Sequence, residues 1–176
     1  MTAQVGDSLN FEGRWYSLSC EPLGLWLQRK KNMRDKTLRF KPITTACWRG
    51  YVAKWEIARG RLYMKSCSGR LIDGSSPTQE ALFANYSKQY LDSLGANDPA
   101  NAGPGIFAFW VTGVVWCTFG ELLAYEHCGY ESIYQGEIHL WMKDGFVIGQ
   151  RIVHREKPAR SELDELEDEF DELEDL

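Results

Sequence analysis

The stretch that decides the fold runs from Gly105 to Val153 and reads GIFAFWVTGVVWCTFGELLAYEHCGYESIYQGEIHLWMKDGFVIGQRIV. Aromatic and β-branched residues dominate it, and such residues are typical of strands. Its second half contains the clearest turn signal in the chain, Lys143-Asp144-Gly145, with apolar alternation on both sides. We therefore predict a final β-hairpin made of Glu137–Met142 and Phe146–Val153, joined by a type I′ turn at Asp144-Gly145.

The two faces of this hairpin are expected to differ, because side chains alternate along a strand. Ile138, Leu140 and Met142 should share one face of the sheet. His139 and Trp141 should lie on the opposite face.

The first half of the stretch predicts further strands. Ile106–Val111 is apolar on both faces, as expected of a central strand. Glu121–Glu126 shows a mixed pattern, and Tyr130–Tyr134 is aromatic and rich in strand-forming residues. The tryptophans that occupy alternating or wholly apolar strands are predicted to be mostly buried: Trp55, Trp110 and Trp141.

The N-terminal half of the chain predicts one more strand and one more hairpin. Gly13–Cys20 reads as a strand that ends near Pro22. Tyr51–Ile57 alternates between apolar and polar residues, Arg59-Gly60 supplies a turn, and Arg61–Lys65 alternates again. This pattern predicts a β-hairpin.

Ser76 and Pro77 predict the start of a helix, because serine caps helices and proline suits their first position. Apolar residues follow at helical spacing until Gly95, a natural end: Leu82, Phe83, Tyr86 and Tyr90. We expect this to be the only helix of the globular part.

A basic segment, Arg29–Lys41, contains seven basic residues and one acid. We interpret it as a solvated loop that leads into an edge strand near Leu38–Phe40. A binding surface for an anion is the alternative.

The composition limits the class of protein. At 176 residues, with 44% apolar and 13% aromatic residues, the chain suits one domain with a real core. No apolar run reaches the roughly 18 residues that a membrane helix needs. The first residues lack the basic start and apolar core of a secretory signal. Five cysteines without CxxC spacing fit reduced thiols, so we expect a cytoplasmic protein that does not enter a membrane.

Charge is divided unevenly along the chain. The net charge is −5, yet residues 161–176 carry ten acids and no base, which leaves 20 basic and 15 acidic residues in 1–160. A body of +5 therefore precedes a tail of −10. We divide the chain into a β-rich globular domain, residues 1–157, and an acidic amphipathic tail, residues 158–176.

The tail also has an apolar side. Leucine and phenylalanine recur at spacings of three and four, which predicts an amphipathic helix: Leu163, Leu166, Phe170 and Leu173. Its other side, which includes Glu167, is strongly acidic, so the helix would be marginal alone and needs a surface to lie on. Within the chain, the acceptor would be the basic segment at Arg29, Lys30 and Lys31. A basic partner or a second copy of the chain would satisfy the same pattern.

No motif in the sequence names a reaction, since no phosphate-binding loop, dinucleotide fingerprint or nucleophile elbow is present. The histidines lie on separate predicted strands without metal-ligand spacing, so neither a metal nor a cofactor is expected. If the protein were an enzyme, the candidate catalytic residues would be Glu131, His127 and His139. They would share a pocket where residues 126–134 meet the His139–Trp141 face.

Two segments carry a resemblance. Arg49–Ile57 reads RGYVAKWEI, and Gly120–Tyr134 reads GELLAYEHCGYESIY. Together they resemble a group of uncharacterised bacterial proteins of similar length, over roughly residues 48–153. The resemblance implies a bacterial, intracellular, β-rich domain, and it implies no activity.

The sequence thus predicts a mostly β protein, an antiparallel sandwich or barrel with one inserted helix and an acidic C-terminal helical tail. The predicted function is non-enzymatic binding of a basic protein, as an inhibitor or immunity-type partner. A small hydrolase or ligand-binding β-barrel is one alternative. A nucleic-acid binder regulated by its own tail is another, although that tail would repel phosphate. The sequence does not predict an oligomeric state.

Overall fold

The structure, a computed structural model, describes residues 2–32, 38–83 and 105–156. The strands are β1 (Ser8–Phe11), β2 (Arg14–Leu18), β3 (Tyr51–Ala58), β4 (Arg61–Gly69), β5 (Ile106–Phe107), β6 (Gly113–Ala124), β7 (Ile133–Lys143) and β8 (Phe146–His154). The described helices are α1 (Pro22–Asn32) and α2 (Gln79–Phe83). The strands form one eight-stranded sheet in the order β3-β1-β2-β6-β7-β8-β4-β5. The prediction of a mostly β protein is confirmed.

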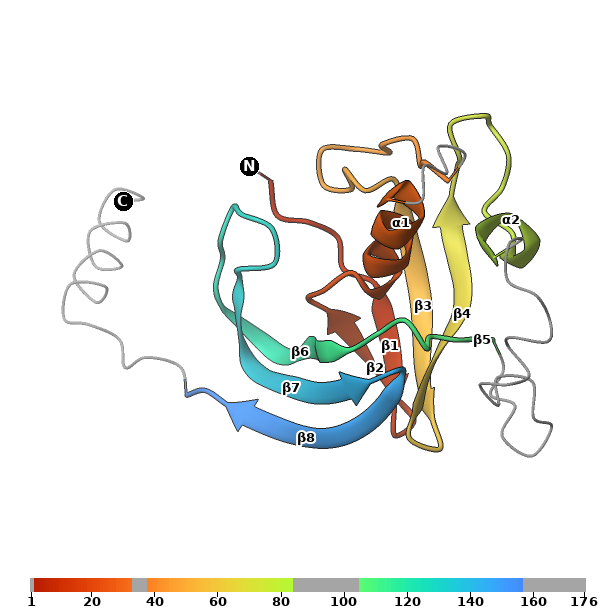
Figure 1. Cartoon of the computed structure of the whole chain (residues 1–176). Helices are drawn as coiled ribbons and strands as arrows, with labels where there is room; N and C mark the ends of the chain where they lie inside the picture. The colour runs from red at the N-terminus through yellow and green to blue at the C-terminus, as the bar shows by residue number, and fades with distance from the viewer. Residues whose placement is uncertain (1, 33–37, 84–104, 157–176) are drawn as a thin grey trace, which may run out of the picture.

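The sheet bends until its two ends meet. β3 pairs with β4, and β4 meets β8 through Arg61 and Phe146, so every strand except β5 belongs to a closed circuit of neighbours (Figure 1). The prediction of a wholly antiparallel arrangement is wrong, because β1 and β3 run parallel. Parallel neighbours need a long connection, and the chain supplies one through β2, α1 and the following loop.

Both predicted hairpins are confirmed, and their turns explain why. Arg59 and Gly60 have φ angles of 51° and 72°, while Asp144 and Gly145 have φ angles of 49° and 82°. Positive φ at both central residues defines the type I′ turn, whose twist matches that of the flanking strands. Gly145 is required for a second reason, since a Cβ there would lie 2.8 Å from the carbonyl oxygen of Ala108.

The segment predicted as a central strand lies elsewhere. Only Ile106 and Phe107 form a strand, β5, and it pairs with β4 at the end of the sheet order. The following residues, Ala108 to Val111, turn through the core and are almost fully buried. The amide of Val111 donates to the carbonyl of Ala108, and the amide of Ala108 donates to the carbonyl of Leu62, so both buried amides are paired. An apolar run cannot by itself distinguish this turn from a buried strand.

Helix α1 was not predicted. The prediction that the helix starting near Pro77 is the only helix of the globular part is therefore wrong. It begins at Pro22, a residue that suits the first helical position, and it continues through the first bases of the basic segment. Lysine, arginine, leucine and glutamine are good helix formers, which offsets the glycine at position 24. The edge strand predicted near Leu38–Phe40 is also wrong, because Phe40 makes only an isolated bridge to Leu71.

Helix α2 begins two residues later than predicted. The amide of Ala81 donates to Oγ1 of Thr78 over 3.1 Å, so Thr78 rather than Ser76 caps the helix. The expected continuation through Tyr86, Tyr90 and Gly95 lies outside the described residues. Neither described helix has the length and apolar character that crossing a membrane requires.

An aromatic cluster joins α1, α2 and the buried turn. The indole of Trp26 stacks on Phe83 at a centroid distance of 5.1 Å and lies 5.2 Å from the ring of Trp110. Both indoles also donate hydrogen bonds to backbone carbonyls, Trp26 to Leu82 and Trp110 to Pro22. The two helices are therefore joined to each other and to the buried turn by packing and by hydrogen bonds.

The burial prediction holds for two of the three tryptophans. Trp55 and Trp110 are 0% and 1% exposed, whereas Trp141 is 39% exposed, so its predicted burial is wrong. The predicted alternation along β7 explains the difference. Ile138, Leu140 and Met142 face the core, while Trp141 shares the outward face with His139.

Candidate functional site

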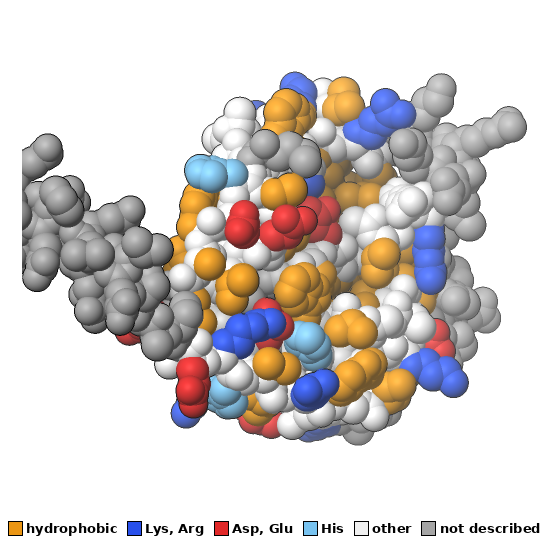
Figure 2. All heavy atoms as spheres, turned by 90° about the vertical axis from the view of Figure 1, so that its left-hand side faces the viewer, with side chains coloured by type: hydrophobic (Ala, Val, Ile, Leu, Met, Phe, Trp, Pro, Cys, Tyr) orange, Lys and Arg blue, Asp and Glu red, His pale blue; other side chains and the backbone are white. Residues whose placement is uncertain are grey.

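The end of the β6–β7 hairpin, with its loop, carries apolar side chains that no other described element covers. Leu122, Tyr125 and Ile133 are 47%, 53% and 40% exposed. Three exposed acids accompany them: Glu121, Glu126 and Glu131. The sequence from residue 105 to residue 142 contains no lysine or arginine. We call these six residues the hairpin surface. Figure 2 shows the side of the molecule that carries the hairpin, where acidic side chains lie among hydrophobic ones.

The hairpin is twisted locally by irregular pairing. The register of β6 and β7 shifts between Phe119 and Leu122 and again between Leu122 and Ala124. Gly120, with φ 79°, allows the first shift, and the side chain of Gln135 lies over it. Bulges of this kind bend a strand and redirect its side chains, which accounts for the exposure of Leu122.

The loop between β6 and β7 is held in place from two sides. Within the loop, the amide of Glu126 donates to Oγ of Ser132 over 3.0 Å. From outside, the N-terminal segment reaches the loop through an Ala3–Gly129 bridge, and the amide of Gln4 donates to the carbonyl of Gly129 over 2.9 Å. The hairpin surface is therefore presented by an ordered loop.

A buried ion pair lies at the base of this loop. Oδ1 of Asp7 accepts a hydrogen bond of 2.7 Å from Arg49, and its Oδ2 accepts one of 2.9 Å from the indole of Trp55. Arg49 also donates to the hydroxyl of Tyr130 over 2.6 Å. That hydroxyl in turn donates to Glu21 over 3.1 Å. This network, buried at Asp7 and Arg49, joins the N-terminal segment, the residue before α1, β3 and the hairpin loop.

The environment fixes the charge states in the network. Burial, the largest single influence, would lower the pKa of Arg49, but Asp7, Tyr130 and Glu21 together outweigh it and hold the pKa above its ordinary value. Burial raises the pKa of the Tyr130 and Tyr51 hydroxyls, so both phenols stay neutral. The Tyr51 hydroxyl and Nε of Arg49 are buried without a hydrogen-bond partner among the described residues.

A small pocket opens beside this network, with a cavity volume of about 90 Å³. Its lining residues come from the N-terminal segment, β2, β6 and the hairpin: Ala3, Gln4, Ser17, Ser19, Thr118, Tyr125, Gly129, Tyr130, Ser132 and Tyr134. We call it the tyrosine pocket. Hydroxyl groups and aromatic rings dominate the lining, and no charged residue takes part.

A second polar cluster lies on the outward face of β7. Oε2 of Glu137 is 2.9 Å from Nε2 of His139, and Oε1 is 2.6 Å from Arg155. Burial alone would raise the pKa of Glu137, but Arg155 and His139 outweigh it and hold the pKa below 4.5, its ordinary value. The carboxylate is therefore ionised near neutral pH and orients the imidazole.

Replacing Glu137 with glutamine should make the free energy of unfolding depend less on pH in the acid range. Because the folded-state pKa lies below the unfolded-state value, the carboxylate stabilises the fold above pH 4.5, and this contribution is lost as the pH falls through the folded pKa. Near neutral pH the free energy of unfolding of the variant should be about 1–3 kcal/mol lower than that of wild type. Urea unfolding measured between acid and neutral pH checks this, with Glu131→Gln as the exposed control. Parallel curves for wild type and Glu137→Gln would contradict it.

The candidate catalytic residues are not joined to one another. His139 contacts Glu137 and the ring of Trp116, whereas His127 contacts Tyr125 at a centroid distance of 4.7 Å. Glu131 is exposed in the loop, and its amide donates to Cys128. No hydrogen bond or ion pair among the described residues links any two of Glu131, His127 and His139. Nor does any group of three histidine, cysteine, aspartate or glutamate residues in this part of the chain converge as a metal site.

Three of the five cysteines are suited to packing rather than to nucleophilic chemistry. All five are free thiols. Burial raises the pKa of Cys20, Cys67 and Cys117 to about 12 in each case. These three thiols are therefore protonated at neutral pH, and a thiol is a far weaker nucleophile than a thiolate.

The predicted binding residues are only partly described. Arg29 is exposed at the end of α1 and lines a shallow hollow with Trp110. Lys30 and Lys31 lie in α1, and the structure describes their backbone but not their side chains. The predicted tail contacts also lie outside the described residues: Leu163, Leu166, Glu167, Phe170 and Leu173.

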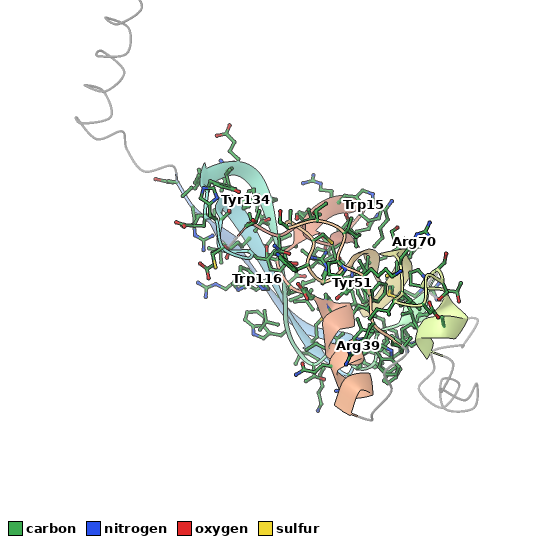
Figure 3. All side chains as sticks on the ribbon, turned by 90° about the horizontal axis from the view of Figure 1, so that it is seen from above. Trp15, Arg39, Tyr51, Arg70, Trp116 and Tyr134 are labelled. Carbon is green, nitrogen blue, oxygen red and sulfur yellow. The ribbon has the colours of Figure 1, made fainter. Side chains whose placement is uncertain are left out.

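Exposed bases gather on another part of the molecule. The amide of Lys41 donates to the carbonyl of Arg70, and the amide of Ile72 donates to that of Arg39, so these bases lie on adjacent backbone segments. All three bases are exposed. In Figure 3, Arg39 and Arg70 lie apart from Trp116 and Tyr134, which mark the β6–β7 side.

Comparison of the chain with protein-family models, with curated proteins and with solved structures finds no match. The resemblance to a group of bacterial proteins therefore stays a prediction.

Proposed function

We propose that this is a non-enzymatic binding protein whose partner is a basic protein, and that the hairpin surface makes the contact. The observation that carries the proposal is the exposure of Leu122, Tyr125 and Ile133 beside three exposed acids. Scattered exposed apolar residues are normal on a protein surface. A group of them on an ordered hairpin, accompanied by exposed acids, is typical of an interaction site.

The two kinds of side chain would contribute differently to binding. Covering the apolar side chains stabilises a complex by roughly 25 cal/mol for each Å² removed from water. The acids at the rim would mainly steer a basic partner and raise its association rate. Because rim charges are exposed, salt should slow association more than it speeds dissociation.

The acidic tail would serve the same partner. Its ten acids would add negative charge that attracts a basic partner, and its leucines and phenylalanine would offer a second apolar contact. An inhibitor or immunity-type partner of a basic protein, acting in the cytoplasm, would need this combination. Such a protein blocks its target by covering it and requires no catalytic group.

A nucleic-acid binder regulated by its own tail is the second candidate. Arg39, Lys41 and Arg70 favour it, because they are exposed on adjacent segments and would contact phosphates. A hydrolase has less support, since Glu131, His127 and His139 share no described hydrogen bond.

Disrupting the hairpin surface should abolish capture of basic proteins. With immobilised protein, cell lysate and stepwise salt elution, we expect the retained proteins to be basic. Leu122→Ser combined with Ile133→Ser should lose them, because the apolar centre of the contact is removed. A chain ending at Arg160 should retain them more weakly at low salt.

The matched control is Ile148→Ser combined with Ile152→Ser, since these side chains are 65% and 51% exposed on β8. This variant should retain the same proteins as wild type. Capture of acidic proteins, or of nucleic acid that nuclease treatment removes, would favour the second candidate. If neither the hairpin substitutions nor the truncation changes which proteins are captured, the proposal is refuted.

A further inference from the structure

We propose that the tyrosine pocket binds the ammonium group of a lysine side chain from the basic partner. This inference rests on the proposed function, and it names the kind of side chain by which the partner would be held. The pocket adjoins the hairpin surface, because Tyr125 belongs to both. A side chain of a protein bound to the hairpin could therefore enter it.

The volume of the pocket limits the ligand. Sites for drug-sized ligands usually occupy about 300–1,000 Å³. At about 90 Å³, the tyrosine pocket has the space of roughly three water molecules. An ammonium group with its last methylene groups is of this size, whereas a nucleotide or a sugar chain is too large.

The lining supplies the contacts that an ammonium group requires. Tyr125, Tyr130 and Tyr134 contribute aromatic rings, whose faces attract cations. Ser17, Ser19 and Thr118 also line the pocket. Their hydroxyl oxygens can accept hydrogen bonds from the three N–H groups of an ammonium ion.

The charges around the pocket favour a cation over an anion. The pocket lining contains no lysine or arginine. The nearest described base is Arg49, which contacts Tyr130, and its charge is offset by Asp7 at 2.7 Å and Glu21 at 3.9 Å. Two carboxylates therefore accompany one guanidinium behind the pocket. An incoming ammonium group would meet net negative charge, and a phosphate or carboxylate would be repelled.

The same network fixes one wall of the pocket before any ligand arrives. The hydroxyl of Tyr130 accepts a hydrogen bond of 2.6 Å from Arg49 and donates one of 3.1 Å to Glu21. Its ring is therefore fixed in position, which reduces the entropy lost on binding. By contrast, Tyr125 is 53% exposed, so it lies at the rim and can be replaced with little effect on the core.

The test is a calorimetric and NMR titration of the full chain with Nα-acetyl-lysine methylamide. The norleucine analogue, which has no ammonium group, and the Nε-acetylated analogue, which has no charge, serve as matched ligands. We expect saturable binding of the lysine compound only, with shifts of the amides of residues 17–19, 118 and 125–134. Tyr125→Ala should weaken binding about fivefold, the loss expected for one cation–π contact. Trp141→Ala, an exposed aromatic on a distant part of β7, should bind as wild type does.

Several outcomes would overturn the inference. Equal binding of the norleucine analogue would show an apolar site, and tighter binding of inorganic phosphate would show an anion site. Equal binding of methylammonium, with no gain from the rest of the lysine compound, would show a site for small free amines rather than for a protein side chain. Retained melting temperature in Tyr125→Ala separates lost binding from lost folding.

Failure of this inference can be distinguished from failure of the proposed function. If the lysine compound does not bind, but the hairpin variant still loses the basic proteins, the pocket assignment is wrong and the proposed function stands. If the lysine compound binds, but capture is unaffected by the hairpin substitutions, the proposed contact surface is wrong.

Discussion

Replacing Asp7 with alanine is expected to lower the free energy of unfolding by about 3–5 kcal/mol, because it leaves a buried charge without its partner. The side chains of Arg49 and Asp7 are only 7% and 0% exposed. Asp7 also accepts hydrogen bonds from the amide of Ala53 and the indole of Trp55. The substitution would therefore strand three donors in the interior.

Urea unfolding measures this loss, and Glu56→Ala supplies the control. Glu56 and Lys65 form an ion pair of 2.8 Å, about as short as the 2.7 Å pair of Asp7 and Arg49, but their side chains are 27% and 31% exposed. An exposed pair contributes only about 0.2–1 kcal/mol. Equal losses in the two variants would show that burial of the Asp7 pair does not matter.

Replacing Trp110 with alanine should cost about 3–5 kcal/mol, the usual loss for a large buried aromatic side chain. Its ring lies 5.2 Å from Trp26 and 5.3 Å from Phe83, so its removal leaves a cavity among three elements. The indole also donates to the carbonyl of Pro22, and this hydrogen bond at the first residue of α1 would be lost. We expect α1 to loosen in this variant, with faster hydrogen exchange along the helix.

Trp141→Ala is the matched control, because Trp141 is 39% exposed on the outward face of β7. It should cost much less than Trp110→Ala in the same urea experiment. An unchanged midpoint for Trp110→Ala would contradict the role given to the aromatic cluster.

The parts of the fold that could be predicted are those with local signals. Arg59-Gly60 and Asp144-Gly145 force positive φ angles at fixed positions, and alternation on either side sets the faces of the strands. Helix α1 has no comparable signal, since its glycine and its run of bases look like a loop. Residues 108–111 form a buried turn only because Trp26 and the β7–β8 turn pack on them, which is tertiary information.

The candidate site was less predictable for the same reason. Asp7, Arg49 and Tyr130 lie far apart in the sequence, and no motif links the three. Only the folded chain shows that they meet. The acids and apolar residues near Glu121 and Glu131 were visible in the sequence, but their exposure depends on irregular pairing that alternation does not encode.

The closed circuit of strands has a consequence for the time course of folding. β1 takes its parallel partner, β3, from beyond α1, and the circuit closes only where β4 meets Phe146 at the start of β8. Such distant pairings must first overcome the entropy of long loops, and folds dominated by them form in milliseconds to seconds rather than microseconds. On a ribosome, β3 and β4 would be complete while β8 was still unmade. The sheet would then remain an open curved surface until Phe146 emerged, with its apolar interior exposed to other chains during that interval.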